Sequence, residues 1–184
     1  MAYIACYETC SYNNYVMNDE IFPIVEPDGR VVGKATRREC HGGSMLLHPV
    51  VHLHVIGAGH TLYLQKRAMT KDIQPGKWDT AVGGHVDFGE STEEALRREA
   101  REELGLTGFE MTALPPYVFC SDRERELINP FIVIIGEETT IVPDPVEISE
   151  GRFWPLAEIE CAIGTGVFTP NFEQEFSIIR KYLD

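Results

Sequence analysis

Apolar residues recur along this chain with two different spacings, and each spacing predicts one kind of element. Residues 50–56 alternate apolar side chains with histidines, and a second alternating run follows at 62–67 after a glycine-rich turn, which predicts a central β-hairpin. Residues 171–183 instead have helical spacing, with four apolar residues on or near one face: Phe172, Phe176, Ile179 and Leu183.

Shorter apolar runs predict the remaining strands. They lie at 21–25, 31–33, 80–82, 109–119 (broken at Pro115 and Pro116), 131–135 and 153–156. Because proline cannot donate to a ladder, Pro23 suits an edge strand. The polar segments 37–44, 68–79 and 122–126 are expected to be loops that separate these strands.

The most informative stretch is an acidic helix predicted at residues 92–104. Ser91 and Glu94 form a capping box before it, and Gly105 supplies a left-handed C-cap after it. Three apolar residues share one helical arc and can pack inward: Leu96, Ala100 and Leu104. Three glutamates share the neighbouring arc: Glu99, Glu102 and Glu103.

Carboxylates this close repel one another and raise one another's proton affinity unless a cation lies among them. A hard divalent ion is the obvious occupant. The alternative interpretation is a solvated helix face on which the glutamates pair with Arg97, Arg98 and Arg101, and an acid-rich helix taken alone usually has that role.

This mixture of strands, one central helix and a closing helix predicts an α/β (α+β) sandwich with a mixed sheet between helices. Residues 1–18 show no clear period and are expected to be an N-terminal extension, and residues 19–184 a single domain. Met17 is an alternative start, so whether residues 1–16 are native stays open.

Composition narrows the class of protein. With 184 residues, 43% hydrophobic and 24% charged, the chain is typical of a globular protein. A formal net charge of −13 argues against binding to nucleic acid or to anionic membranes. Five scattered cysteines and the lack of an apolar leader or span predict reduced thiols and a cytoplasmic location.

The residues around the acidic helix have a fixed frame: Gly84, five residues, Glu90, seven residues, Arg98-Glu99-Ala100, one residue, Glu102-Glu103, one residue, Gly105-Leu106. This frame resembles the Nudix box in every defined position, and a broader likeness extends over about residues 21–156. The resemblance implies a Nudix-type α/β/α sandwich. It also implies Mg²⁺- or Mn²⁺-dependent hydrolysis of a diphosphate linkage in a small organic diphosphate such as a nucleoside diphosphate derivative.

The resemblance also implies roles for single residues. Glu99, Glu102 and Glu103 would bind the metal together with the carbonyl of Gly84, and Glu99 or Glu102 would orient or deprotonate water. Glu90 would pair with Arg98 in a structural role. A homodimer is common in the family and is expected on that ground alone.

The flanking residues resemble those of type 1 isopentenyl-diphosphate isomerases, which share the Nudix fold. That likeness implies that Arg67 and Lys71 contact the diphosphate, and it implies a second metal site at five positions: His41, His48, His85, Glu124 and Glu126. The isomerases need a catalytic cysteine at the position that Gly83 occupies here. A glycine cannot move a proton on a carbon skeleton, so isomerisation is not expected.

Each of these assignments has a simpler alternative. Arg67 and Lys71 suit ordinary strand ends, and histidines in alternating strands, such as His52 and His54, are more often surface or core residues than ligands. Trp78 suits either base stacking or a loop anchor. A third class of function is a non-catalytic module that binds a nucleotide, which the complete set of box glutamates disfavours.

Overall fold

The sheet is organised around one long strand, β3 (Leu47–Gly57), in a computed structural model that describes residues 19–71 and 73–183. One edge of β3 pairs in parallel with β9 (Arg125–Ile134) along almost its whole length. Its other edge is divided between two antiparallel partners, β6 (Val82–His85) near the start and β4 (Thr61–Arg67) near the end. Because a strand edge offers one set of hydrogen bonds, β4 and β6 diverge from one another along β3.

The other strands extend this sheet. Its order is β10-β4-β3-β9-β7, with β10 at Ile148–Pro155 and β7 at Thr112–Ala113. The short strands β5 (Trp78–Asp79) and β8 (Tyr117–Cys120) pair with β4 and β9. A separate two-stranded sheet joins β1 (Ile21–Val25) and β2 (Val31–Thr36). The sheet is mixed, as predicted.

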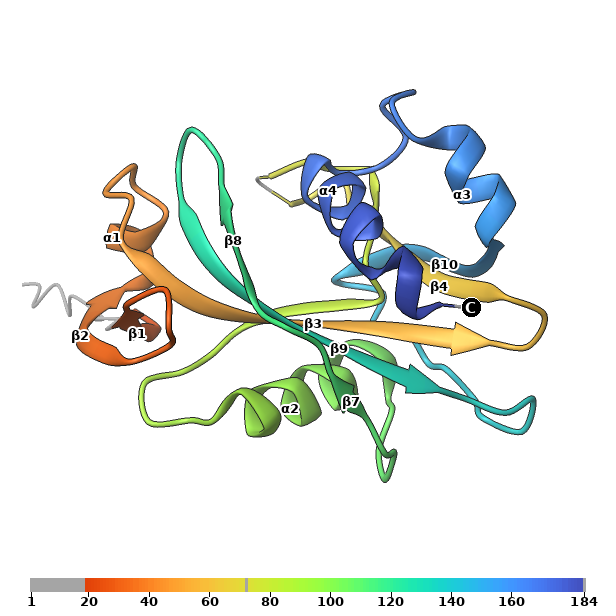
Figure 1. The fold of residues 1–184 in the computed structure, drawn as a ribbon, viewed down its shortest axis with the longest axis horizontal. Coiled ribbons are helices and arrows are strands. Elements are labelled where there is room, and N and C mark those ends of the chain that lie inside the picture. Colours follow the sequence, from red (N-terminus) through yellow and green to blue (C-terminus); the bar gives the residue numbers. More distant parts are fainter. Residues whose placement is uncertain (1–18, 72, 184) are drawn as a thin grey trace, which may run out of the picture.

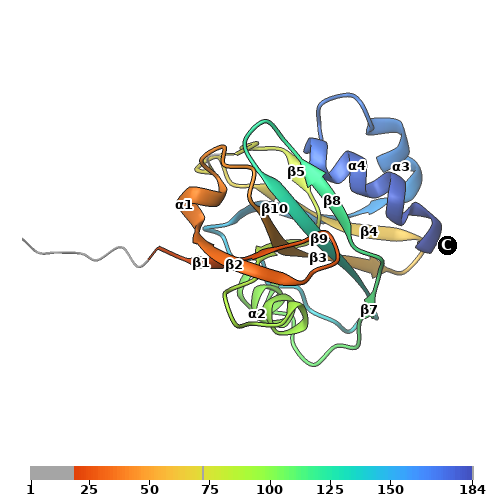
Figure 2. The same ribbon diagram turned by 60° about the vertical axis from the view of Figure 1, so that its left-hand side comes forward.

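Helices cover both faces of the sheet (Figure 1). Helix α2 (Thr92–Leu104) packs on one face over a core that includes Val51 and Leu53 of β3. Helices α3 (Leu156–Ala162) and α4 (Pro170–Ile179) lie on the opposite face, and Figure 2 shows the same separation from another direction. The three layers confirm the predicted α/β/α sandwich.

Helix α2 has the predicted bounds because its signals are local. Ser91 Oγ accepts the amide of Glu94, and the Glu94 carboxylate accepts the amide of Ser91 at 2.9 Å. Gly105 closes the helix in the left-handed region at φ 66°, which a glycine adopts without strain. The inward residues Leu96, Ala100 and Leu104 are fully buried.

Several predicted boundaries were wrong. The segment 37–44 contains a short helix, α1 (Arg37–Cys40), capped by Thr36, where a loop was expected. The charged segment 122–126 is only partly a loop, because β9 begins at Arg125 and its pairing with β3 tolerates charged residues at the start. The run 109–119 supplies two short strands, β7 and β8, and helix α3 was not predicted at all.

The C-terminal helix is shorter than predicted. Helix α4 ends at Ile179 and a 3₁₀ turn, η1 (Arg180–Tyr182), completes the segment. All four apolar residues expected on its buried face are buried. The predicted extension 1–18 lies outside the described residues, so that domain boundary stays a prediction.

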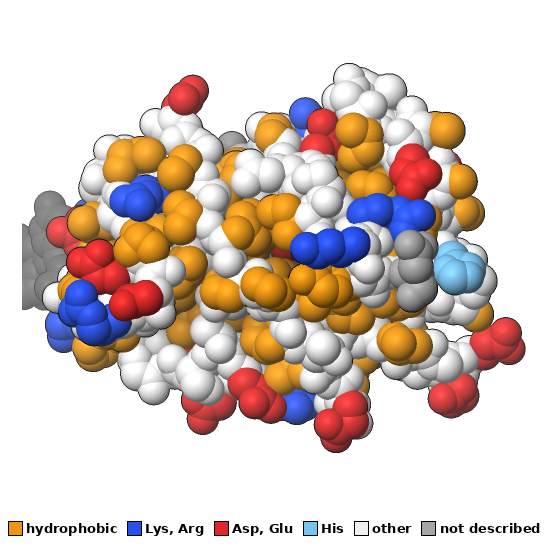
Figure 3. All heavy atoms as spheres, viewed as in Figure 1, with side chains coloured by type: hydrophobic (Ala, Val, Ile, Leu, Met, Phe, Trp, Pro, Cys, Tyr) orange, Lys and Arg blue, Asp and Glu red, His pale blue; other side chains and the backbone are white. Residues whose placement is uncertain are grey.

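The surface matches the acidic composition. On the face in Figure 3, apolar side chains form a band across the middle, and acidic side chains lie mainly around the margin. Lysine and arginine side chains form small separate groups on this face. The search of the described part of the chain found no helix long and apolar enough to cross a membrane.

Candidate functional site

A cavity of about 870 Å³ opens where β4 and β6 diverge, beside the acidic face of α2. Most of the residues singled out from the sequence line it: Gly84, Glu99, Glu102, Glu103, Arg67, Lys71, His41, His85, Glu124 and Glu126. Residues from α1 to the start of α4 therefore meet in one hollow, and the fork in the sheet explains why it lies there.

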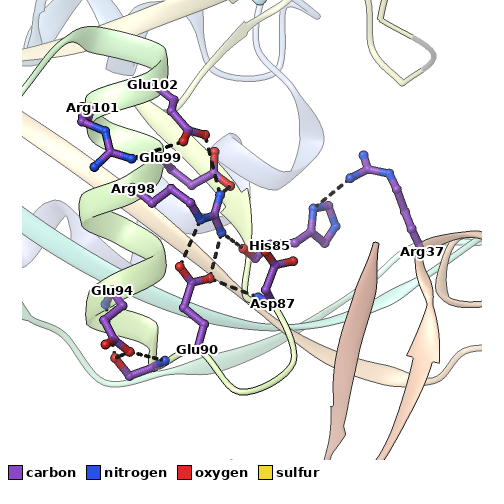
Figure 4. A network of polar contacts seen from close by, with 10 residues as sticks. Arg37, His85, Asp87, Glu90, Glu94, Arg98, Glu99, Arg101 and Glu102 are labelled. Atoms are coloured by element: carbon purple, nitrogen blue, oxygen red, sulfur yellow. Dashed lines mark hydrogen bonds and ion pairs between the residues drawn. The ribbon is translucent and has the colours of Figure 1, made fainter. Parts of the chain in front are cut away.

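Arg98 holds the loop before α2 against the helix (Figure 4). Its Nε and Nη2 donate to the two oxygens of Glu90 at 3.0 and 2.8 Å, and Nη2 also donates to the backbone carbonyl of His85 at 3.0 Å. The expected Glu90–Arg98 contact is therefore present, and it ties three parts of the box together. Arg98 lines the cavity, whereas Glu90 does not, which fits a structural role for that glutamate.

Glu99 is the partly buried acid of the cluster. Its Oε1 accepts from Arg98 Nη1 at 2.6 Å, and its carboxylate lies against Gly84 so closely that a Cβ atom on Gly84 would overlap it. Burial raises the pKa of Glu99, and Arg98 opposes that effect. The glycine of β6 thus makes room for the acid of α2.

Glu103 is the most buried of the three acids, at 8% exposure, and Glu102 the most open. Gln65 of β4 donates its Nε2 to Glu103 Oε2 at 3.1 Å. Burial, followed by the nearby Glu99, raises the pKa of Glu103 to about 8. Gln65 was not predicted as a functional residue; its signal was a polar side chain in an apolar alternating strand.

The carboxylate cluster fits a hard divalent cation. Three acids on one wall supply oxygen ligands of the kind that Mg²⁺ and Mn²⁺ prefer. Burial and the neighbouring Glu99 raise the pKa of Glu103, so an added positive charge would favour its ionised form. A cation bound there would supply that charge, with Glu99, Glu102 and Glu103 as the side chains that hold it.

The two predicted phosphate-binding residues face the same cavity but already have acidic partners. Arg67 donates its Nε to the carbonyl of Ile73 at 3.0 Å and its Nη1 lies 3.4 Å from Asp79 Oδ2. Lys71 forms an ion pair with Glu147. A bound phosphate would therefore share or replace these carboxylates.

The predicted second metal site is gathered around three histidines. Ligand atoms of His41, His48 and His85 lie within 4.8 Å of one another, and His41 Nε2 is 3.0 Å from His85 Nε2. His48 Nε2 is buried without a hydrogen-bond partner among the described residues. Burial lowers the pKa of His48 and that of His85, so both rings are neutral, the form that binds metal.

The two predicted glutamates lie near the histidines, but their carboxylate oxygens are not part of the group of converging ligand atoms, which holds the three histidines alone among the described residues. Glu124 Oε2 lies 2.5 Å from His41 Nδ1, and this contact lowers the pKa of Glu124 although burial acts in the opposite direction. Glu126 is aligned with His48 in the β3–β9 ladder, and burial raises its pKa to about 7. Nitrogen and oxygen ligands of this kind fit a transition metal better than Mg²⁺.

Three further residues take positions that the sequence left open. Trp78 is buried against Trp154, with ring centroids 5.1 Å apart, so it is an anchor of the core and not a base-stacking residue. His52 reaches the cavity, while its neighbour in the alternation, His54, is fully buried. Both lie close to Glu175 of α4, which was expected only as part of the closing helix.

Comparison with known proteins agrees with this fold. The family model described as NUDIX domain matches residues 46–172. An uncharacterized Nudix hydrolase of Streptomyces coelicolor is 29% identical over 167 residues, which cover 89% of this chain and 90% of the relative. An isopentenyl-diphosphate Delta-isomerase of Leifsonia xyli is 36% identical over 160 residues, 83% of each chain.

Solved structures show the same fold. A protein of Deinococcus radiodurans superposes with a TM-score of 0.74 at 24% identity, covering 88% of this chain and 98% of that one. The NUDIX domain of Shewanella oneidensis NrtR, solved with ADP-ribose, has a TM-score of 0.61 at 16% identity, covering 74% of this chain and 88% of that one. The chain belongs to the Nudix family, and its relatives are both hydrolases and isomerases by name.

Proposed function

We propose that this protein hydrolyses a diphosphate linkage in a small organic diphosphate, of the class of nucleoside diphosphate derivatives, with Mg²⁺ or Mn²⁺ as cofactor. The observation that carries the proposal is that Glu99, Glu102 and Glu103 line the same cavity as Arg67 and Lys71. Carboxylates for a metal and cationic side chains for phosphate are thus present in one cavity.

Phosphoryl transfer needs positioning and charge neutralisation more than covalent help from the protein. When bound, the divalent ion neutralises phosphoryl charge and makes a bound water more acidic. The protein's own part is to fix the acids: Arg98 holds Glu99, and Gln65 holds Glu103. Glu99 or Glu102 accepts the proton of the attacking water.

The relatives support a nucleotide-derived substrate. One Nudix domain of the same fold was solved with ADP-ribose, which contains a diphosphate between two ribose groups. The loop residues that border the cavity here are Lys71, Ile73, Gln74, Asp122 and Arg123, and they would contact the groups on either side of the diphosphate.

A substrate panel tests this proposal. Purified protein is incubated with nucleotide, dinucleotide, nucleotide-sugar and isoprenoid diphosphates in Mg²⁺ or Mn²⁺, and released phosphate and monophosphates are measured. Hydrolysis of at least one class that stops in EDTA supports the proposal. Tight nucleotide binding without metal and without turnover would contradict it and would indicate a non-catalytic binding module.

A second candidate is isomerisation of isopentenyl diphosphate, which the histidine cluster and the 36% identical relative favour. Gly83 argues against it, because the position carries no side chain able to donate or accept a proton. Incubation of isopentenyl diphosphate in deuterated water separates the two: the hydrolase proposal predicts no deuterium in the carbon skeleton, and incorporation would establish the isomerase.

A further inference from the structure

His52 lines the cavity but belongs to neither the carboxylate cluster nor the histidine cluster. His52 of β3 is aligned with Gly83 of β6 and is 7% exposed. A Cβ atom on Gly83 would lie 3.4 Å from His52 Cδ2 and 3.5 Å from Nε2, so the ring edge lies directly beside the space that the glycine leaves. Both residues line the cavity. The glycine that removes isomerase chemistry therefore uncovers a histidine.

His52 is held from behind by a buried carboxylate. Glu175 of α4 is fully buried, and its Oε2 accepts from His52 Nδ1 at 2.7 Å. Its other oxygen lies 3.2 Å from His54 Nε2, and His54 Nδ1 lies 3.2 Å from Thr80 Oγ1. A carboxylate on Nδ1 fixes the ring orientation and leaves Nε2 as the nitrogen available to a ligand. Among the described residues, the side chain of His52 bonds through Nδ1 to Glu175 and makes no hydrogen bond through Nε2.

The charge on this ring suits an anionic ligand. Burial disfavours the imidazolium, but Glu175, with Asp79 and Glu126 also facing the ring, raises the pKa of His52 to about 9. At neutral pH, Nε2 therefore carries a proton and donates. Glu175 occupies Nδ1 of His52 and leaves the Nε2 edge to the cavity, so His52 can contact a diphosphate there in addition to Arg67 and Lys71.

The backbone of β6 lies between this ring and the metal cluster. Gly84 lies against Glu99, and the preceding residue, Gly83, lies against His52. Consecutive residues of a strand point to opposite faces, so the two glycines separate the carboxylate wall from the histidine. A diphosphate bound through a metal ion at Glu99 could extend across Gly83 and Gly84. Its second phosphoryl group would then lie toward His52.

We propose that His52, oriented by Glu175, is a substrate-binding residue whose Nε2–H donates to a phosphoryl oxygen on the side of the diphosphate that lies over Gly83. The inference rests on the proposed hydrolase function and deepens it, because it assigns a recognition residue outside the Nudix box. It also gives the fully buried acid of α4 a role: Glu175 orients the His52 ring, which lines the cavity.

Binding of a non-hydrolysable probe tests this inference without turnover. Titration of methylenediphosphonate in Mg²⁺ by calorimetry is expected to show an affinity about tenfold to hundredfold lower for His52→Gln than for the wild type, the effect of losing a hydrogen bond from a charged donor. The matched control is His60→Asn, since His60 is an exposed histidine in the β3–β4 turn, outside the cavity. Equal affinities for His52→Gln and the wild type would overturn the proposal.

Two more variants distinguish a role of His52 in binding the probe from a purely structural contact between α4 and β3. The first variant is Glu175→Gln, in which no carboxylate keeps the His52 ring protonated. As pH rises, its advantage in probe affinity over His52→Gln should therefore disappear at a lower pH than the advantage of the wild type does. Gly83→Ala keeps the pair but fills the space beside it, so affinity should fall while the His52 ring keeps its wild-type titration by NMR. The proposal would be overturned if Gly83→Ala bound the probe as tightly as the wild type and if the ratio of wild-type to His52→Gln affinity did not depend on pH. The contact between His52 and Glu175 would then have only a structural role.

The outcome is distinguishable from failure of the hydrolase proposal. Metal-dependent hydrolysis with unchanged probe affinity in His52→Gln overturns this inference alone. Conversely, a loss of probe affinity in His52→Gln, in a protein that hydrolyses nothing in the panel, supports the diphosphate contact and overturns the hydrolase assignment.

Discussion

Gly84 of β6 lies so close to the Glu99 carboxylate that any side chain at position 84 would overlap it. Gly84→Ala is therefore expected to displace Glu99 while leaving the ladder between β6 and β3 in place. Misplacement of a catalytic group by about 1 Å costs about 100-fold in rate, so kcat/KM should fall by about that factor.

The control for this variant is Gly33→Ala in β2, where a Cβ atom would meet Ile24 only at 4.0 Å. This substitution should leave both kcat/KM and the thermal midpoint near wild type. Wild-type kcat/KM in Gly84→Ala would show that the Glu99 carboxylate does not need the position seen here.

The Glu90–Arg98 pair should contribute to stability, because both side chains are partly buried and the contact is bidentate. Glu90→Gln is expected to lower the free energy of unfolding by about 1–3 kcal/mol, measured by urea denaturation. The control is Glu93→Gln, which removes the exposed helical pair of Glu93 with Arg97 and should cost about 0.5 kcal/mol or less. Equal costs in the two variants would contradict a locking role for Glu90.

Stability of the metal-free protein should depend on Glu103. Its pKa is about 8 in the folded chain against 4.5 for the free side chain, so the folded state holds the proton more tightly than the unfolded state. The free energy of unfolding should therefore fall as pH rises from about 4.5 to 8. In EDTA, the free energy of unfolding of Glu103→Gln, measured by urea denaturation, should fall less than that of the wild type over that pH range. Equal falls in the two proteins would contradict a raised pKa of Glu103.

The histidine cluster should bind a metal of its own. Because His48 Nε2 is buried and has no protein partner among the described residues, a cation there would satisfy it. Metal analysis after dialysis against Zn²⁺ or Mn²⁺ should find one equivalent less in His48→Gln than in the wild type. The same variant should lose the part of the metal-dependent rise in thermal midpoint that belongs to this site. Identical metal content in the two proteins would contradict the second site.

The sequence predicted helix α2 to the residue because its signals are local. Ser91, Glu94 and Gly105 mark its ends, and the acids and apolar residues between them have a single period. Strand β9 had no such signal: its first residues are charged, and their place in the sheet depends on pairing with β3, which is remote in sequence. Pairing partners of that kind decide strand boundaries but leave no local trace.

In the candidate site, too, residues with a local sequence signal were predicted from that signal, and residues brought together by remote pairing were not. The glutamates of α2 could be placed from helical spacing, whereas the histidine cluster joins positions 41, 48 and 85 and was accessible only through a resemblance. The contact between His52 and Glu175 joins residues 123 apart and depends on how α4 packs against the sheet. No pattern in either segment indicates the other.

The central claim is that Glu99, Glu102 and Glu103 form the metal site of a diphosphate hydrolase. Its most direct test is turnover of the best substrate in the panel by Glu102→Gln and Glu103→Gln, with Mn²⁺ affinity of each variant measured in parallel and folding checked by circular dichroism. The account predicts folded variants with weakened Mn²⁺ binding and abolished release of phosphate or monophosphate. Full activity in both folded variants would contradict it.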